Sequence, residues 1–215
     1  LTDCDILFKT KWVFETIKLF NTFKGVGSVS PIPTRTAVRY FTFSAQEAIF
    51  RKKIDLKFES IPENFRAHNK FLKSINWDKE TSKTKQWPLI CKNSTKAVIG
   101  SDHQVLTIRR DIFFNNSPSK PSFTKVGKES EREYVDKAID LSGGLRLSTH
   151  NFHAFHMGNK LEDWMLKEYD ALENSENLVL KLIPKLRYKQ VNYYWYKVKK
   201  RILKKAFEFK IPSNY

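Results

Sequence analysis

The chain has 215 residues, of which 40% are hydrophobic and 14% aromatic, a composition that excludes an intrinsically disordered chain and predicts a folded core. Its cysteines, Cys4 and Cys91, are too few for a disulfide framework and lack a C-x-x-C metal spacing, so we expect a reducing, cytoplasmic compartment. The net charge is +16, and no apolar run reaches the roughly 20 residues that a membrane-spanning helix needs.

The first feature along the chain is a pair of aspartates, Asp3 and Asp5, directly before the apolar residues 6–8. Carboxylates at i and i+2 of an extended segment project from the same side, so both can reach one divalent cation. A bare D-x-D is a short motif, and two aspartates that only flank a strand give the same pattern. Leu1 is neither an initiator Met nor part of a signal peptide, so we expect further residues before it.

An α/β unit is predicted after this opening strand. Apolar residues recur at close to helical spacing from Trp12 onward, and Gly25 breaks that helix. A short strand follows around Val26 and Val29 and must end at Pro31. Strand, helix and strand in this order indicate a layer of parallel strands covered by helices.

The middle of the chain is less regular. Ser44 and Glu47 predict a capping box at the start of a helix, and Pro62 introduces a second helix. Strand character returns around residues 105–108, and residues 115–122 have the composition of a loop. We find no internal repeat in the sequence.

Residues 127–159 hold the densest group of polar side chains. Acidic residues begin a helix there, where their negative charge interacts favourably with the helix dipole. Gly143 and Gly144 end this helix before a strand over 145–149. Three histidines follow that strand, where loops in α/β folds bind ligands: His150, His153 and His156. A zinc triad would need a different spacing or supporting cysteines. We therefore expect one histidine to face a metal or phosphate and the others to be packed or solvated.

Positive charge is concentrated near the C-terminus. Residues 181–210 contain eleven Lys or Arg and the single acid Glu208. A predicted helix over 188–209 has lysines around most of its circumference and one apolar stripe, formed by Val191, Tyr194, Trp195, Val198, Ile202 and Ala206. Such a helix can lie on anionic lipid, or it can dock on the core through its aromatic face.

Several short motifs follow one another along the chain: D-x-D, a helix, VGSVSP, an acidic helix, the strand G-x-R-L-S-T and H-M-G-N. In this order and spacing they resemble the second half of a GT-A glycosyltransferase of the family 2 type, over most of residues 1–159. The resemblance implies an α/β fold in which residues 1–165 are the C-terminal part of a Rossmann-like nucleotide-diphospho-sugar transferase domain, without its N-terminal nucleotide-binding part. Residues 166–215 would be a helical, strongly basic extension.

By this resemblance, Asp3 and Asp5 would hold Mg²⁺ or Mn²⁺ against the diphosphate of a nucleotide-sugar donor. A cation there would stabilise the negative charge that develops on the departing nucleoside diphosphate. His156 stands where some family members have a further metal ligand or phosphate contact, with His153 as the second choice. Arg146 could contact a phosphate, or it could point outward from its strand.

An inverting transferase also needs a carboxylate that takes the proton from the acceptor hydroxyl. Family members carry it at the start of the helix before the glycine-containing strand, commonly as Glu-Asp. The register from Gly143 places Glu131 and Arg132 there, so the expected Asp is absent. Glu131 is the candidate base, with Glu129 and Asp136 behind it, although all three could be solvated acids at a helix start.

The resemblance therefore implies a metal-dependent, inverting glycosyltransferase that moves a sugar to a glycan or lipid-linked acceptor, on the cytoplasmic face of a membrane if residues 188–209 bind anionic lipid. The alternative is a nucleic-acid-binding module that uses the basic aromatic tail. Against it, the charge is confined to one end and no recognition signature is present. A metal-dependent phosphohydrolase could use the same D-x-D, but the sequence shows no nucleophile or second metal cluster for it.

Overall fold

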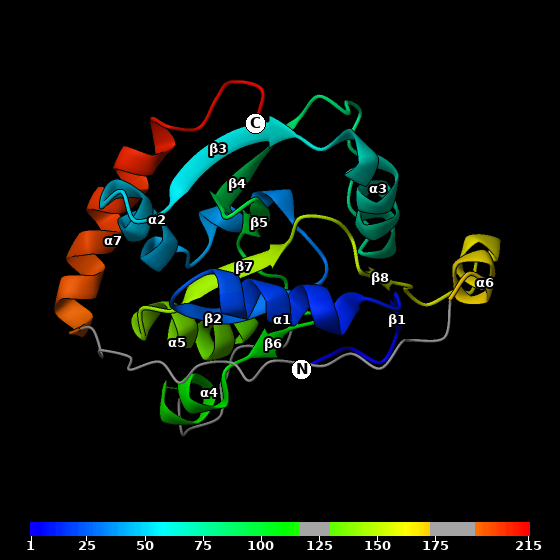
Figure 1. The fold of residues 1–215 in the computed structure, drawn as a ribbon, viewed down its shortest axis with the longest axis horizontal. Helices are drawn as coiled ribbons and strands as arrows, with labels where there is room; N and C mark the ends of the chain where they lie inside the picture. The colour runs from blue at the N-terminus through cyan, green and yellow to red at the C-terminus, as the bar shows by residue number, and fades with distance from the viewer. Residues whose placement is uncertain (117–129, 173–191) are drawn as a thin grey trace.

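The computed structural model describes residues 1–116, 130–172 and 192–215, and its centre is a six-stranded sheet of order β3-β4-β5-β7-β2-β6 (Figure 1). The strands of this sheet are β2 (Val26–Ser30), β3 (Asp55–Ser60), β4 (Gln86–Lys92), β5 (Thr95–Ile99), β6 (Thr107–Ile108) and β7 (Leu145–Thr149). β2 and β7 run parallel, whereas the other neighbouring pairs are antiparallel. The predicted α/β class is confirmed, but the expected layer of parallel strands is reduced to one pair.

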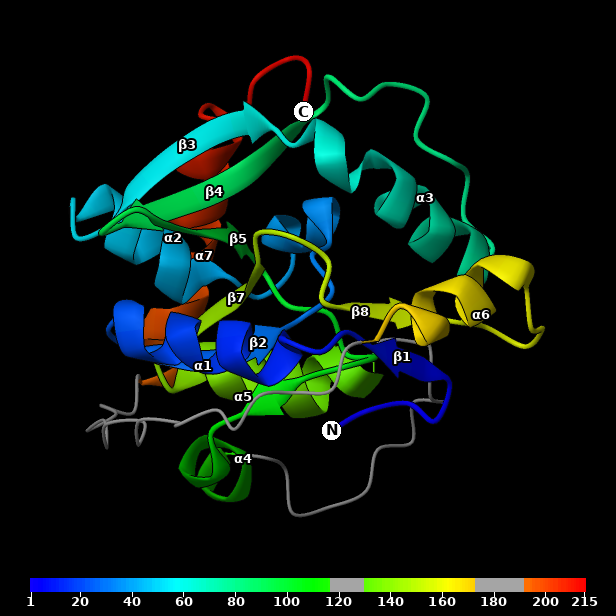
Figure 2. The ribbon, with the colours of Figure 1, turned by 45° about the vertical axis from the view of Figure 1, so that its right-hand side comes forward.

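Helices cover the sheet and extend beyond its ends (Figures 1 and 2). They are α1 (Trp12–Thr22), α2 (Phe43–Phe50), α3 (Phe65–Ser74), α4 (Arg110–Asn116), α5 (Lys137–Leu141), α6 (Asp163–Asp170) and α7 (Tyr193–Glu208), with a π-helical turn at Arg132–Asp136 and 3₁₀ turns at Arg35–Arg39 and Pro62–Asn64. The helix predicted from Trp12 is confirmed. The predicted capping box is wrong, because Ser44 lies inside α2 and its hydroxyl donates to the Asp140 carbonyl at 2.9 Å.

The opening strand does not join the main sheet. β1 (Ile6–Phe8) pairs antiparallel with β8 (Ala154–His156), and the two form a separate ribbon near α3 and α6 (Figure 2). The predicted strand-helix-strand layer is therefore wrong for its first member. The apolar side chains of β1 pack in a hydrophobic cluster with Phe152 and Phe155, beside the β7–β8 connection. This pairing brings the D-x-D segment next to the H-M-G-N segment.

The hairpin of β4 and β5 was not predicted from the sequence. Its two turn residues, Asn93 and Ser94, have φ values of 46° and 61°, as a two-residue hairpin turn of the I′ type requires. Most of β4 is buried, so its apolar residues form a continuous run rather than an alternating pattern. Such a run does not distinguish a strand from a buried helix, which explains the omission.

One hydrophobic cluster joins the C-terminal segment to the rest of the chain. Phe207 of α7 is buried with Leu19 and Phe20 of α1 and with Leu147 of β7. At the end of the chain, the Tyr215 hydroxyl donates to the Arg35 carbonyl at 2.6 Å. Residues on both sides of the predicted boundary at residue 165 therefore share one hydrophobic cluster. In the described parts of the chain, no helix combines the length and the apolar character needed to cross a bilayer.

Candidate active site

The D-x-D aspartates and His156 lie together at one end of the β1–β8 ribbon. The strand register sets Ile6 opposite His156, and the Met157 N–H donates to the Asp5 carbonyl at 2.8 Å. One ligand atom from each of Asp3, Asp5 and His156 lies within 4.8 Å of the other two. The Asp5 Oδ2 atom is 3.2 Å from His156 Nε2. Two segments about 150 residues apart in the sequence thus converge, as the resemblance requires.

Backbone contacts and one hydroxyl hold this group in place. The Asp3 N–H donates to the Gln104 carbonyl at 2.8 Å. His156 Nδ1 is 2.8 Å from the hydroxyl oxygen of Ser74, at the end of α3. That hydroxyl donates its own proton to the Phe71 carbonyl at 2.7 Å, so it can only accept from His156. In the neutral imidazole, Nδ1 therefore carries the proton and Nε2 directs its lone pair toward Asp5.

A lone pair facing a carboxylate is repulsive unless a proton or a cation lies between them. The surrounding negative charges also favour a proton or a cation at this position. Partial burial, followed by the neighbouring Asp5 carboxylate, raises the pKa of Asp3 above its usual value, and His156 opposes that rise. Asp102 and Glu131 add further negative charge. Two carboxylates and one imidazole nitrogen form a donor set that suits Mg²⁺ or Mn²⁺, so the residues present fit the implied metal.

Asp3 also lines a cavity of about 740 Å³ beside this group. Its apolar wall includes Phe71, Ile75 and the exposed Trp77, from α3 and the residues that follow it. Its polar lining includes Asp102, His103, Glu131, Arg132, Asp136 and Arg146. Cavities of this volume with a few convergent polar groups are typical of ligand sites. Asp3 of the candidate metal group therefore lines the same cavity as two of the predicted acids, Glu131 and Asp136.

Two predicted site residues, Asp136 and Arg146, belong to a buried ion-pair network. Both side chains are 1% exposed, and Arg146 Nη2 is 2.7 Å from Asp136 Oδ1. The guanidinium also donates to the carbonyl oxygens of Tyr40 and Ser101, both at 2.6 Å. The alternative in which Arg146 points outward is wrong, because its donors are engaged within the fold. Its contact with a phosphate stays a prediction. Burial lowers the pKa of Arg146, an effect that Asp136 opposes.

His103 completes this network and was missed by the sequence analysis. Its Nε2 is 2.8 Å from Asp136 Oδ2, while its side chain remains 30% exposed. Because one Asp136 oxygen faces Arg146 and the other faces His103, Asp136 holds these side chains in place and is poorly arranged to act as a base. The available signal was the Ser-Asp-His sequence at 101–103, shortly after the buried apolar residues 97–99.

Of the remaining predicted acids, Glu131 lies among the described residues, and its role as a base stays a prediction. It lies at the start of the π-helical turn, is half-buried and lines the cavity together with Asp3. The Ser130 hydroxyl donates to Glu131 Oε2 at 3.2 Å, which orients the carboxylate. Glu129 lies outside the described residues.

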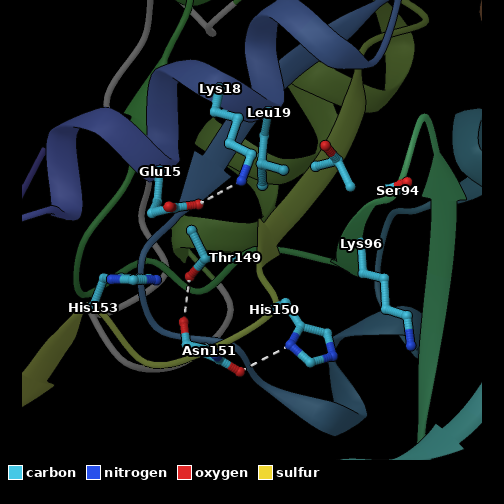
Figure 3. A pocket seen from close by; sticks show the side chains of 10 residues that line it. Glu15, Lys18, Leu19, Ser94, Lys96, Thr149, His150, Asn151 and His153 are labelled. Atoms are coloured by element: carbon cyan, nitrogen blue, oxygen red, sulfur yellow. Dashed lines mark hydrogen bonds and ion pairs between the residues drawn. The ribbon is translucent and has the colours of Figure 1, made fainter.

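The other two histidines line a different hollow, which Figure 3 shows from close by. This hollow has a volume of about 310 Å³ and includes Lys18 and Lys96 in its lining. His150 Nδ1 lies 2.8 Å from Asn151 Oδ1, and burial lowers the pKa of His153. The second-choice assignment of His153 to the metal is therefore wrong, and the histidines do not form a triad. One histidine faces the aspartates, while the others are packed or solvated. That this histidine faces a metal or phosphate stays a prediction.

Comparisons with protein-family models, with curated proteins and with solved structures gave no match for this chain.

Proposed function

We propose that this chain contributes the metal-binding and acceptor-side part of a glycosyltransferase. The reaction would move a sugar, with inversion, from a nucleotide-sugar donor to a hydroxyl of a glycan or lipid-linked acceptor. The observation that supports this proposal most directly is the Asp3, Asp5 and His156 group, with ligand atoms within 4.8 Å of one another at the edge of a 740 Å³ cavity.

In this proposal, Asp3 and Asp5 hold the cation through carboxylate oxygens and His156 holds it through Nε2. Ser74 fixes the imidazole by accepting from Nδ1, as groups behind a metal ligand commonly do. The bound Mg²⁺ or Mn²⁺ would neutralise charge on the leaving nucleoside diphosphate. An oxygen-rich site with one nitrogen suits both ions.

Glu131 acts in this proposal as the base that takes the proton from the acceptor hydroxyl. Its carboxylate lines the same cavity as Asp3, and its charge contributes to the raised pKa of Asp3. Trp77 and Ile75 provide an apolar wall against which a sugar ring can lie. An inverting transfer requires one base on the acceptor side. The absence of the second acid of the Glu-Asp pair therefore does not exclude this reaction.

The phosphohydrolase reading is less well supported. A two-metal hydrolase places a second cation about 3.5–4 Å from the first and needs ligands for both. Among the described residues, three metal-ligating side chains gather in the Asp3, Asp5 and His156 group. That set is sufficient for one cation with open positions for phosphate oxygens.

The proposal is tested in the complete protein with Asp5→Asn, which keeps the side-chain shape and removes the charge. Release of nucleoside diphosphate from a panel of UDP-, GDP- and dTDP-sugars is measured with an acceptor mixture, with MnCl₂ and with EDTA. We expect at least about a hundredfold loss of the Mn²⁺-dependent rate, because a charge-stabilising group is removed from the transition state. Asp55→Asn, an exposed acid on β3, is the matched control. Full metal-dependent transfer by Asp5→Asn would refute the assignment.

A further inference from the structure

Helix α7 has two apolar faces, and the inner one attaches it to the fold. Tyr196 and Phe207 are buried, and the Tyr196 hydroxyl donates to Asp140 Oδ2 at 2.9 Å. Lys199 Nζ is 3.1 Å from Glu47 Oε1 of α2. These contacts hold the helix in one orientation, so the side chains on its opposite face have a defined direction.

The outer face carries the stripe that the sequence analysis identified. Tyr194 is 79% exposed, Trp195 65% and Ile202 62%, and Val198 is also exposed. Phe209, about two turns beyond Ile202, is 91% exposed. The alternative in which the helix docks through this aromatic stripe is wrong, because Tyr196 and Phe207 dock it instead. Val191, the first predicted member of the stripe, lies outside the described residues.

Basic side chains border this exposed stripe. α7 contains six Lys or Arg and one acid, Glu208. Lys199 and Lys200 lie toward the fold, where Lys199 pairs with Glu47 and Lys200 lies over the Phe41 ring. The remaining four are exposed and stand beside the stripe: Lys197, Arg201, Lys204 and Lys205. An apolar stripe with interfacial Trp and Tyr and flanking cations is the composition of a helix that lies in the plane of a membrane surface.

We propose that the outer face of α7 binds the surface of an anionic lipid bilayer. The aliphatic and aromatic side chains would enter the boundary between headgroups and acyl chains, and the flanking cations would contact anionic headgroups. A nucleic acid would match the charge and the aromatic rings but offers no apolar phase for Val198, Ile202 and Phe209. Two copies of this face would repel each other, because each presents the same exposed cations.

Helix α7 lies away from the β1–β8 ribbon, which carries the candidate metal group (Figure 1). Figure 1 shows α7 at the left edge of the molecule and the β1–β8 ribbon on the right, with the main sheet between them. The cavity extends toward the α7 side, because Tyr40 lines it and the next residue, Phe41, lies under Lys200. The lipid contact does not depend on the proposed transferase activity, and the two can be tested separately.

The experiment is co-sedimentation of the full chain with vesicles of phosphatidylcholine alone or mixed with phosphatidylserine. We expect binding to the mixed vesicles that is weakened by salt, and little binding to phosphatidylcholine. The double variant Trp195→Ser/Ile202→Gln changes exposed residues and should lower the partition coefficient at least about tenfold. Lys204→Gln/Lys205→Gln should lower it by a similar factor.

Matched controls distinguish binding by this surface from non-specific binding to vesicles. Phe114→Ser removes a 70% exposed aromatic from α4, and Lys79→Gln/Lys83→Gln removes two exposed cations near α3. Both should bind vesicles like the wild type, as should Asp5→Asn. The proposal is overturned if the α7 variants bind as well as the wild type. It is also overturned if the chain binds single-stranded oligonucleotides but not anionic vesicles. Sedimentation velocity that shows a second copy bound through this stripe would overturn it as well.

Discussion

Among the described residues, two aspartate–histidine pairs are similar in distance and opposite in setting. Asp136 lies 2.8 Å from His103 and Asp5 lies 3.2 Å from His156. Asp136 is 1% exposed and has the Arg146 guanidinium on its other oxygen. Asp5 is 27% exposed and has another carboxylate, Asp3, as its neighbour. One pair is compensated within the fold, whereas the other carries excess negative charge at the surface.

This difference indicates which pair stabilises the fold and which pair is available for a ligand. A buried carboxylate needs a compensating charge, and removing its partner leaves an uncompensated charge inside the protein. A half-exposed group of two carboxylates and an imidazole gains little stability from its own contacts, since water screens them. The Asp3, Asp5 and His156 group would gain most from an added cation. The predictions below test this contrast in order of expected effect.

The largest effect is expected from Arg146→Met. Asp136 would remain buried without its main counter-charge, and breaking such a pair costs about 3–5 kcal/mol of unfolding free energy. Chemical denaturation at neutral pH measures this loss. Arg146→Met/Asp136→Leu, which removes both charges, should recover part of it. The contrast fails if Arg146→Met is as stable as the wild type, or if His156→Gln is equally damaging.

The second prediction concerns the metal. A ligand that binds only the folded state stabilises it by about 2.7 kcal/mol at a hundred times its dissociation constant. MnCl₂ should therefore raise the melting temperature of the wild type and leave that of Asp5→Asn unchanged. His103→Gln is the matched control, because it alters the other pair and should retain the shift. A Mn²⁺ shift that survives Asp5→Asn would place the cation elsewhere.

A smaller effect is expected from Ser74→Ala. The hydroxyl orients His156 without touching the cation, and loss of such a supporting group typically lowers metal affinity by about tenfold or more. Calorimetric titration with MnCl₂ measures the change. Ser82→Ala, in the loop after α3, is the control. Unchanged affinity in Ser74→Ala would show that Nε2 is not a ligand or is oriented by other contacts.

The smallest effect is expected from Asp3→Asn in the absence of metal. The pKa of Asp3 is raised in the folded state, so the folded state binds this proton more strongly than the unfolded state. Stability contributed by this group is present at low pH and is lost as pH rises through the raised pKa. Asp3→Asn should therefore be slightly more stable than the wild type at pH 7, by up to a few tenths of a kcal/mol for so exposed a group.

That small gain should vanish at a pH below the usual value for aspartate, where both states are protonated. Thermal melts of the two proteins across this range, in EDTA, provide the measurement. A stability loss on Asp3→Asn at pH 7 would mean that this carboxylate is already compensated within the fold, and the comparison of the two pairs would then fail.

The sequence by itself determined much of the local structure. The periodicity after Trp12 indicated α1, and the apolar residues around Val29 and Leu147 indicated β2 and β7. These predictions succeeded because spacing and flanking glycines act within one element. The proximity of the D-x-D and H-M-G-N segments was expected from a resemblance and is present in the geometry. Metal binding and sugar transfer stay predictions.

Tertiary structure alone decided how those elements are paired and compensated. β1 pairs with β8 rather than entering the main sheet, and Arg146 turns inward because Asp136 and two carbonyl groups lie there. The outer stripe of α7 is exposed because Tyr196 and Phe207 find partners in the core. A helical pattern shows that a face is apolar, but burial depends on residues more than a hundred positions away, and these act only after the chain has folded.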